Sequence, residues 1–172
     1  MSATPATTSA TTNWKIDPAH SAAEFKVKHM MISNVRGKFT DINGTLNFDN
    51  ANPGRSSVEA TFPIASLHTG DDKRDGHLKS PDFFDAEKFP TAAFKSSEVN
   101  KTADGEFAVV GALTLHGVTR NVSFAVEDFS APGKDPWGNT RRGLTATARI
   151  NRKDFGLTWN TALETGGVLV GD

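Results

Sequence analysis

The chain has 172 residues, a formal net charge of −1 at pH 7 and no cysteine. This length fits one domain with a sizeable core, and the lack of cysteine excludes disulfides, thiol nucleophiles and thiolate metal sites. The near-neutral charge argues against a general affinity for nucleic acid, which needs many phosphate-neutralising Lys and Arg residues.

Residues 1–13 come first, and their bias toward Thr, Ala and Ser predicts a disordered tail. They lack the charged and apolar regions of a secretory signal peptide, and no apolar run in the chain approaches the length of a membrane span. We therefore expect a single domain over residues 14–172 in a cytoplasmic protein, or in a periplasmic or secreted one if a leader was removed.

Period-two alternation marks the first half of that domain. AEFKVKH at residues 23–29 places apolar residues such as Phe25 on one face and lysines on the other, which is typical of a half-buried strand. VRGKF at residues 35–39 repeats the pattern, and Asn43-Gly44 is a strong hairpin signal. These segments predict consecutive antiparallel strands.

The second half contains further strands at residues 107–116, 118–129 and 143–150, with turns at Asp104-Gly105 and His116-Gly117. The total is about eight strands, which predicts an all-β protein with an extended antiparallel barrel. Its inward faces mix large and small residues, and small barrels use such mixing either to fill the interior or to leave a cavity.

The alternation stops between these halves, where the sequence predicts a short helical insertion at about residues 70–88. Thr69 or Asp71 can cap a first short helix, and Ser80-Pro81-Asp82 is a good start for a second one. From the residues alone, this insertion either seals an ordinary core or covers a binding cavity.

Two adjacent phenylalanines, Phe83 and Phe84, follow the predicted start of the second helix. Neighbouring residues on a helix diverge by roughly 100°, so the two rings cannot share one direction. We expect one ring to enter the domain and the other to pack beneath the flanking segment.

Polar residues with a candidate role are few. The five histidines lack the HExxH spacing of a zinc hydrolase, and the GxSxG motif of serine hydrolases is absent from the sequence. We therefore predict neither a catalytic nor a metal site. His29 ends an inward-facing row and Arg120 shares a face with apolar neighbours, so either could contact a ligand head group. The alternatives are a barrel-rim residue for His29 and a solvent-reaching side chain for Arg120. The basic run at Arg141-Arg142, with Arg149 and Arg152 nearby, is interpreted as a solvated strand edge.

Several segments resemble the YceI-like family of lipid-binding proteins: WKIDPAHSAAEFKVKH, HLKSPDFFD, LTLHGVT, RKDFGLTW and GGVLVGD, in this order across residues 14–172. The resemblance implies a lipocalin-like, extended antiparallel barrel with a long apolar pocket. It also implies a long amphiphilic ligand, such as a polyisoprenoid or an isoprenoid quinone, and no catalytic activity or cofactor.

The chain departs from this family at its end. Family members usually continue after GGVLVGD into one more strand that helps to close the barrel, whereas this chain stops at Asp172. We therefore expect either a shortened chain or an open sheet edge that a neighbouring molecule fills, which would give a homodimer.

Together, the residues and the resemblance predict a protein that stores or transports a long apolar amphiphile. The expected wall and lid residues are Phe25, Val27, Phe39, Phe62, Phe83, Phe84, Phe94, Leu113, Leu115, Phe124 and Trp159. One alternative is a stress-response or interaction module whose barrel is filled by its own side chains. A weaker alternative is a hydrolase or isomerase that uses His29 or His116.

Overall fold

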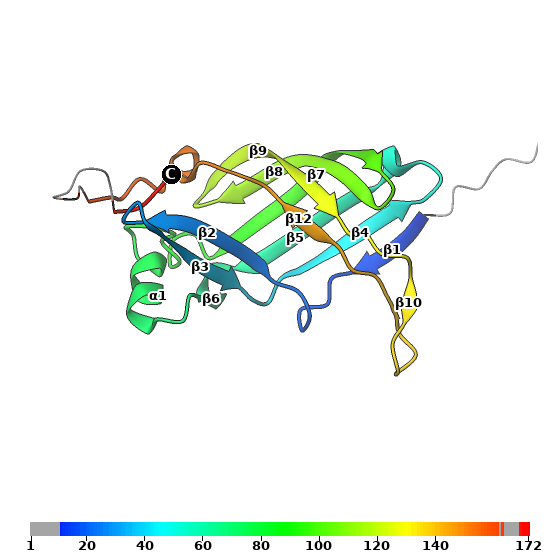
Figure 1. Ribbon diagram of the computed structural model, residues 1–172, viewed down its shortest axis with the longest axis horizontal. Helices are drawn as coiled ribbons and strands as arrows, with labels where there is room; N and C mark the ends of the chain where they lie inside the picture. The colour runs from blue at the N-terminus through cyan, green and yellow to red at the C-terminus, as the bar shows by residue number, and fades with distance from the viewer. Residues whose placement is uncertain (1–10, 162, 164–168) are drawn as a thin grey trace, which may run out of the picture.

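The computed structural model describes residues 11–161, 163 and 169–172, and strands dominate it (Figure 1). Before the helix lie β1 (Thr11–Lys15), β2 (Ala23–His29), β3 (Ser33–Phe39), β4 (Asn43–Asp49), β5 (Ser57–Pro63) and β6 (Leu67–His68). After helix α1 (Asp72–Lys79) lie β7 (Thr91–Ala103), β8 (Glu106–Leu115), β9 (Val118–Glu127), β10 (Gly133–Lys134), β11 (Thr140–Arg141) and β12 (Thr145–Thr147). Short 3₁₀ turns occupy Pro53–Arg55, Ile64–Ser66 and Arg152–Phe155.

The strands form a curled half-barrel. Seven antiparallel strands make one sheet in the order β1-β4-β5-β7-β8-β9-β12, and β2, β3 and β6 make a second sheet. Helix α1 and the turn of the β2–β3 hairpin lie at one end of the molecule, and the small β10–β11 hairpin lies at the other (Figure 1). The predicted all-β architecture with one helical insertion is confirmed.

Alternation along the strands directs one row of side chains inward. In β8 the buried residues are Phe107, Val109, Leu113 and Leu115, and each is separated from the next by a more exposed position or a glycine. Gly111 occupies the middle of this row because a Cβ there would lie 2.7 Å from the Cα of Ser96, in the paired strand β7. The glycine therefore permits the close approach of β7 and β8 at this position.

Two hydrophobic cores result. The α1-end core consists of Phe39, Ile64, Leu67, Phe83, Ala92, Leu113, Leu115, Val122, Phe155 and Leu157. The distal core consists of Phe48, Val99, Phe107, Val109 and Val126. Phe94 and Phe124 are partly buried and pack against both cores, so they mark the middle of the half-barrel.

The N-terminal strand β1 was not predicted. Thr11 to Asn13 belong to β1 and pair with β4, whereas the sequence predicted a tail through residue 13. Pairing with β4 satisfies the backbone N–H and C=O groups of these residues. Amino-acid composition alone does not reveal such a pairing. Residues 1–10 of the predicted tail lie outside the described residues.

Two local predictions were wrong. Asn43-Gly44 is no hairpin turn, because both residues lie in β4 and pair with β5, and a Cβ at Gly44 would lie 2.8 Å from the Cα of Ala60. The glycine is therefore needed for close strand approach rather than for a turn. The predicted second helix after Ser80 is a series of turns, in which the amide of Asp85 donates to the carbonyl of Ser80.

Candidate functional site

The inner face of the seven-stranded sheet carries five of the predicted wall residues: Phe62, Phe94, Leu113, Leu115 and Phe124. Phe94 in β7 lies directly between Ala60 of β5 and Leu113 of β8, so a large side chain is flanked by a small one and a buried one. The ring centroids of Phe94 and Phe124 are 5.0 Å apart in an edge-to-face arrangement. This pair connects the two cores across β8.

The β2–β3 hairpin supplies the facing side. Phe25 is directly opposite Gly37, and a Cβ at Gly37 would lie 2.6 Å from the Cε1 atom of Phe25, so the ring rests over the glycine. The ring of Phe39 is 5.7 Å from that of Phe25 and 4.6 Å from that of Phe62, between centroids. These contacts hold the hairpin against the large sheet by aromatic packing.

The helical insertion is anchored by polar groups. Asp71 caps α1, because its side chain accepts a hydrogen bond from the amide of Arg74, and this bond lowers the pKa of Asp71. Asp75 is buried and accepts hydrogen bonds from the amide and the hydroxyl of Thr69. The helix is therefore fixed to the residues that precede it by its own acidic side chains.

The two adjacent phenylalanines diverge as predicted, although the segment that carries them is not helical. The ring of Phe84 contacts the rings of Phe25 and Phe39, with centroid distances of 6.3 and 5.4 Å. The ring of Phe83 instead lies 5.3 Å from that of Trp159. The insertion thus reaches the hairpin through one ring and the C-terminal segment through the other.

Burial divides the predicted wall into two groups. Phe39, Phe83, Leu113 and Leu115 are at most 9% exposed and belong to the α1-end core. The remaining aromatic members are only partly buried, and we call them the aromatic layer: Phe25, Phe62, Phe84, Phe94, Phe124 and Trp159. Val27 is also partly buried, on the inner face of β2.

The structure also contains two shallow depressions, of about 510 and 370 Å³. Most of their lining residues, such as Ser123 and Thr61, alternate with buried or half-buried residues in their strands and so face outward. Of the predicted wall, only Phe124 and Phe94 border them. These depressions belong to the outer surface of the sheet and not to the predicted interior site.

The structure places the two head-group candidates in different surroundings. His29 is half-buried at the end of β2 and forms an isolated antiparallel bridge with Val170. Arg120 is exposed, and its Nε donates to the carbonyl of Asp154 over 3.2 Å. Among the described residues, no hydrogen bond or ion pair joins His29 to Arg120, so their role at a head group stays a prediction.

The other histidines are held by individual partners. His116 lies at the β8–β9 turn, where its Nδ1 is 3.0 Å from the carbonyl oxygen of Phe155 and its ring packs edge-on against Phe89. His77 is 2.9 Å from a carboxylate oxygen of Asp82. In the part of the chain that the structure describes, no three His, Asp or Glu side chains form a group that could hold a metal ion.

One member of the predicted solvated strand edge, Arg142, is not solvated. Arg142 lies over the rings of Phe129, Phe48 and Trp14, at 3.8, 5.1 and 5.4 Å from their centroids, and burial lowers its pKa. These cation–π contacts cap the distal core. Nothing local in the sequence points to them, because the three rings come from distant segments.

Arg152 also has a structural role that the sequence prediction missed. Its guanidinium donates to the carbonyls of Leu157, Trp159, Val170 and Gly171. The C-terminal segment is thereby tied to β2, since the amide of Gly171 also donates to the carbonyl of Lys28. Partial burial lowers the pKa of Arg152, yet the four acceptors satisfy the charge.

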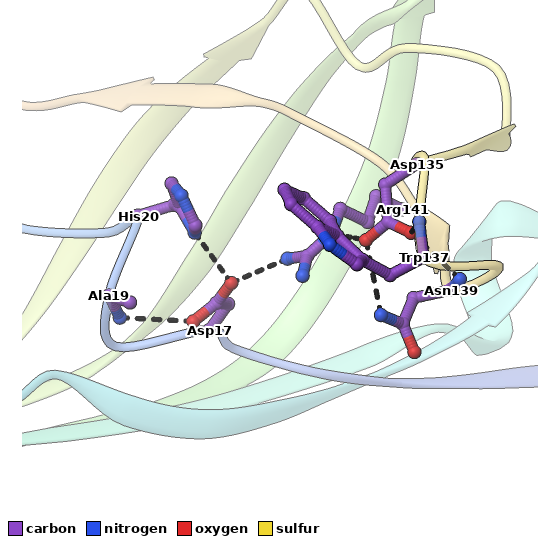
Figure 2. A network of polar contacts seen from close by, with 7 residues as sticks. All are labelled: Asp17, Ala19, His20, Asp135, Trp137, Asn139 and Arg141. Carbon is purple, nitrogen blue, oxygen red and sulfur yellow. Dashed lines mark hydrogen bonds and ion pairs between the residues drawn. The ribbon is translucent and has the colours of Figure 1, made fainter.

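A second polar cluster joins the β1–β2 turn to the β10–β11 hairpin (Figure 2). Arg141 donates to the carboxylates of Asp17 and Asp135, with N–O distances of 2.5 and 2.6 Å. Hydrogen bonds from His20 and Arg141 lower the pKa of Asp17 to about 2, and that from Arg141 lowers the pKa of Asp135 to about 2. Because each charge has a partner, we interpret this cluster as a clasp between elements.

Helix α1 is short and polar, and within the described residues no helix is long and apolar enough to cross a membrane.

The aromatic contacts described above define the candidate site. It is the aromatic layer between the two sheets, with the helical insertion packed beside it.

Comparisons with known proteins agree with this geometry. The chain is 42% identical to a UPF0312 protein of Vibrio cholerae over 139 residues, which is 81% of this chain and 73% of that protein. It is 43% identical to a UPF0312 protein of Photorhabdus laumondii over 145 residues, which is 83% and 74% of the two chains.

Solved structures share the fold. BcnA of Burkholderia cenocepacia aligns with a TM-score of 0.73 and 26% identity over 81% of this chain and 83% of that one. The YCEI protein of Campylobacter jejuni aligns with a TM-score of 0.66 and 33% identity over 82% of both chains. A polyisoprenoid binding domain from Saccharophagus degradans aligns with a TM-score of 0.54 and 18% identity, over 78% and 75% of the two chains. The YceI-like domain model matches residues 14–172, and the chain belongs to this family.

Proposed function

We propose that this protein binds the apolar chain of a long amphiphile, such as a polyisoprenoid or an isoprenoid quinone, and stores or transports it. The observation that carries this proposal is the aromatic layer. Its six side chains are only partly buried and pack against a cluster of ten buried residues. Such rings offer apolar contact at a small cost in side-chain entropy.

The energetic basis is desolvation. Removing an apolar chain from water yields about 0.8 kcal/mol for each CH₂ group, before the costs of ordering the ligand and the protein. A ligand with many CH₂ or isoprene units therefore gains more than a compact one. This favours a long chain laid along the aromatic layer, from Phe124 toward Phe25, over a small rigid ligand.

Family membership points to a binding protein rather than an enzyme. The neighbour described as a polyisoprenoid binding domain supports the fold alone, because its identity to this chain is only 18%. The chemical class of the ligand therefore rests on the aromatic layer, and the choice among isoprenoid amphiphiles is decided by experiment.

The proposal is tested by native mass spectrometry of the purified protein, combined with organic extraction and with uptake of a fluorescent polyprenyl or quinone probe in solution. We expect a co-purifying chain of isoprenoid or fatty mass, or saturable uptake of the probe. A double variant with Phe94→Ala and Phe124→Ala should lose uptake, whereas Ser123→Ala on the outward face of β9 should retain it. Repeated absence of both a bound chain and probe uptake would overturn the proposal.

The alternative is an interaction or stress-response module with a filled interior. The observation that favours it is the close packing of the α1-end core, in which Phe155 and Ile64 are 1% exposed. The two proposals differ in one measurement, because a filled module takes up no apolar probe while remaining fully folded.

We also propose that the half-barrel pairs with a second copy. β12 is an edge strand of the large sheet, and among the described residues the outer edge of β2 pairs only with the short segment around Val170. Unpaired strand edges favour association with another chain. Light scattering after size exclusion should show a mass that rises to the dimer with concentration, and Thr145→Pro, which removes no buried side chain, should reduce it. A monomer at all accessible concentrations would contradict this.

A further inference from the structure

The turn of the β2–β3 hairpin exposes three consecutive apolar side chains. Met30, Met31 and Ile32 are 44%, 55% and 81% exposed. The other exposed large apolar residues of the described chain, Trp137 and Leu144 among them, do not adjoin one another in this way. We call these three residues the apolar tip, and such clusters on a protein surface mark sites of interaction.

The backbone of the tip is unusual as well. Met30 and Met31 have φ angles of 52° and 64°, and the amide of Ile32 donates to the carbonyl of His29, which closes a tight turn. Two successive residues with positive φ are typical of a type I′ hairpin turn, where Asn-Gly is strongly preferred. Methionine is disfavoured there, and these two side chains remain 44% and 55% exposed. The folded chain alone thus gives no reason for these side chains, and strained positions often coincide with functional ones.

The outward face of the same hairpin is basic. Lys26 lies directly opposite Arg36, and Glu24 lies opposite Lys38. Together with Lys28, the hairpin carries four cations and one acid, in a chain whose net charge is −1. Among the described residues, none of these four cations takes part in an ion pair. Like charges opposite each other destabilise a free hairpin, and an approaching anionic surface relieves this repulsion.

The apolar tip also lies near the candidate site. The β2–β3 turn is at the α1 end of the half-barrel, where the amide of Met30 donates to the carbonyl of Leu169 (Figure 1). The inward row of β2 runs from His29 through Val27 to Phe25, which belongs to the aromatic layer. An apolar chain entering beside the tip therefore meets a continuous row of inward-facing side chains.

We propose that the β2–β3 hairpin docks on an anionic lipid bilayer. The apolar tip enters the boundary between head groups and acyl chains, and Lys26, Lys28 and Arg36 contact lipid phosphates beside it. A small apolar insertion combined with a few basic residues gives reversible attachment to such surfaces. Docking would allow an amphiphile to move between the bilayer and the aromatic layer. This transfer rests on the function proposed above, whereas the docking itself does not.

The test is flotation of the purified protein with vesicles of phosphatidylcholine alone or of phosphatidylcholine with phosphatidylglycerol. We expect binding to the anionic vesicles that weakens with added salt, because salt screens the cations. Replacing Lys26, Lys28 and Arg36 by Gln should weaken the partition constant about fivefold for each cation, on the order of a hundredfold together.

The tip is tested separately by the double variant Met30→Asn and Met31→Gly. Asn-Gly suits this turn, so the variant should unfold no more easily than the parent while it loses roughly tenfold in vesicle binding. Trp137→Ser serves as the control for an exposed apolar residue elsewhere, and the triple change of Arg55, Lys101 and Lys134 to Gln controls for net charge. Both controls should bind like the parent.

Three results would overturn the docking proposal: no binding of the parent protein to anionic vesicles, equal binding by the tip variant, or loss of binding in the control variants. Tight binding to an acidic polypeptide without vesicle binding would instead assign the basic face to a protein partner and would also overturn it. Probe uptake in the absence of vesicles is measured alongside, so that failure of docking is distinguished from failure of ligand binding.

Discussion

Phe124 and Phe155 are both aromatic, yet their environments differ. Phe155 is 1% exposed in the α1-end core, whereas Phe124 is partly buried and touches both cores. The alternation places a side chain on the inner face, but the depth of burial depends on which other segments cover it. The sequence pattern therefore places Phe124 and Leu113 on the inner face alike. It does not show that Leu113 is buried and Phe124 only partly buried.

Because of this difference, truncation of the two rings should affect stability and ligand affinity to different extents. Phe155→Ala removes a fully buried ring and should lower the free energy of unfolding by about 3–5 kcal/mol. Phe124→Ala should cost roughly half of that or less, while it weakens binding of a polyprenyl or quinone probe roughly tenfold, because the ring is accessible to ligand. Urea unfolding and probe titration on both variants check this pair. Equal loss of affinity in the two would show that ring accessibility does not matter.

At the level of elements, the helical insertion was predicted in place, and Asp71 was one of its two candidate caps, but its full form was not predicted. The residues after Ser80 form turns, in which hydrogen bonds such as that from the amide of Phe84 to the carbonyl of Leu78 compete with a helix. Local capping signals cannot decide between a second helix and this series of turns. That choice depends on where Phe83 and Phe84 find apolar partners.

Phe84 and Phe83 allow a test of the insertion as a lid. Phe84→Ala removes the contacts with Phe25 and Phe39 on the hairpin and should speed release of a bound probe. Phe83→Ala removes the contact with Trp159 and a buried ring, so it should mainly lower stability. Stopped-flow release rates and thermal unfolding of the two variants are compared. If Phe84→Ala lowers stability and leaves release unchanged, the insertion is a structural cover only.

The clasp between the β1–β2 turn and the β10–β11 hairpin should make stability depend on pH. Asp17 and Asp135 have pKa values lowered from 3.8 to about 2 in the folded chain, so the clasp contributes fully above about pH 4 and is lost as the pH falls through about 2. The stability difference between the parent and Arg141→Gln should therefore be constant near neutral pH and shrink between pH 4 and 2.

Denaturant unfolding at several pH values measures this effect, with the exposed Arg55→Gln as a control that should show no such change. A difference between the parent and Arg141→Gln that is the same at pH 2 and pH 7 would contradict an electrostatic clasp and would indicate a contribution from packing alone.

For the whole molecule, a ligand that occupies the aromatic layer binds only the folded chain and should stabilise all of it. At a free ligand concentration about 100 times its Kd, the gain is about 2.7 kcal/mol. For a chain of this length, that gain corresponds to a rise in Tm of about 5–10 °C.

Thermal unfolding with and without a solubilised polyprenyl or quinone ligand measures this rise, with a short-chain analogue of the same head group as control. The short analogue should have little effect, because it buries few CH₂ groups. Equal stabilisation by both compounds would place the interaction at the head group and not along the aromatic layer.

The sequence by itself determined the strand-rich architecture, the place of the helical insertion, the inward face of each long strand and the family. These follow from patterns between near neighbours in the chain, and from motifs whose spacing is preserved over residues 14–172. Only the tertiary structure decided which inward residues are core and which form the aromatic layer, that Arg142 covers three rings, and that Gly44 lies inside a strand. The physical reason is that burial and partner choice depend on segments far apart in the chain, which meet only when the sheets close on each other.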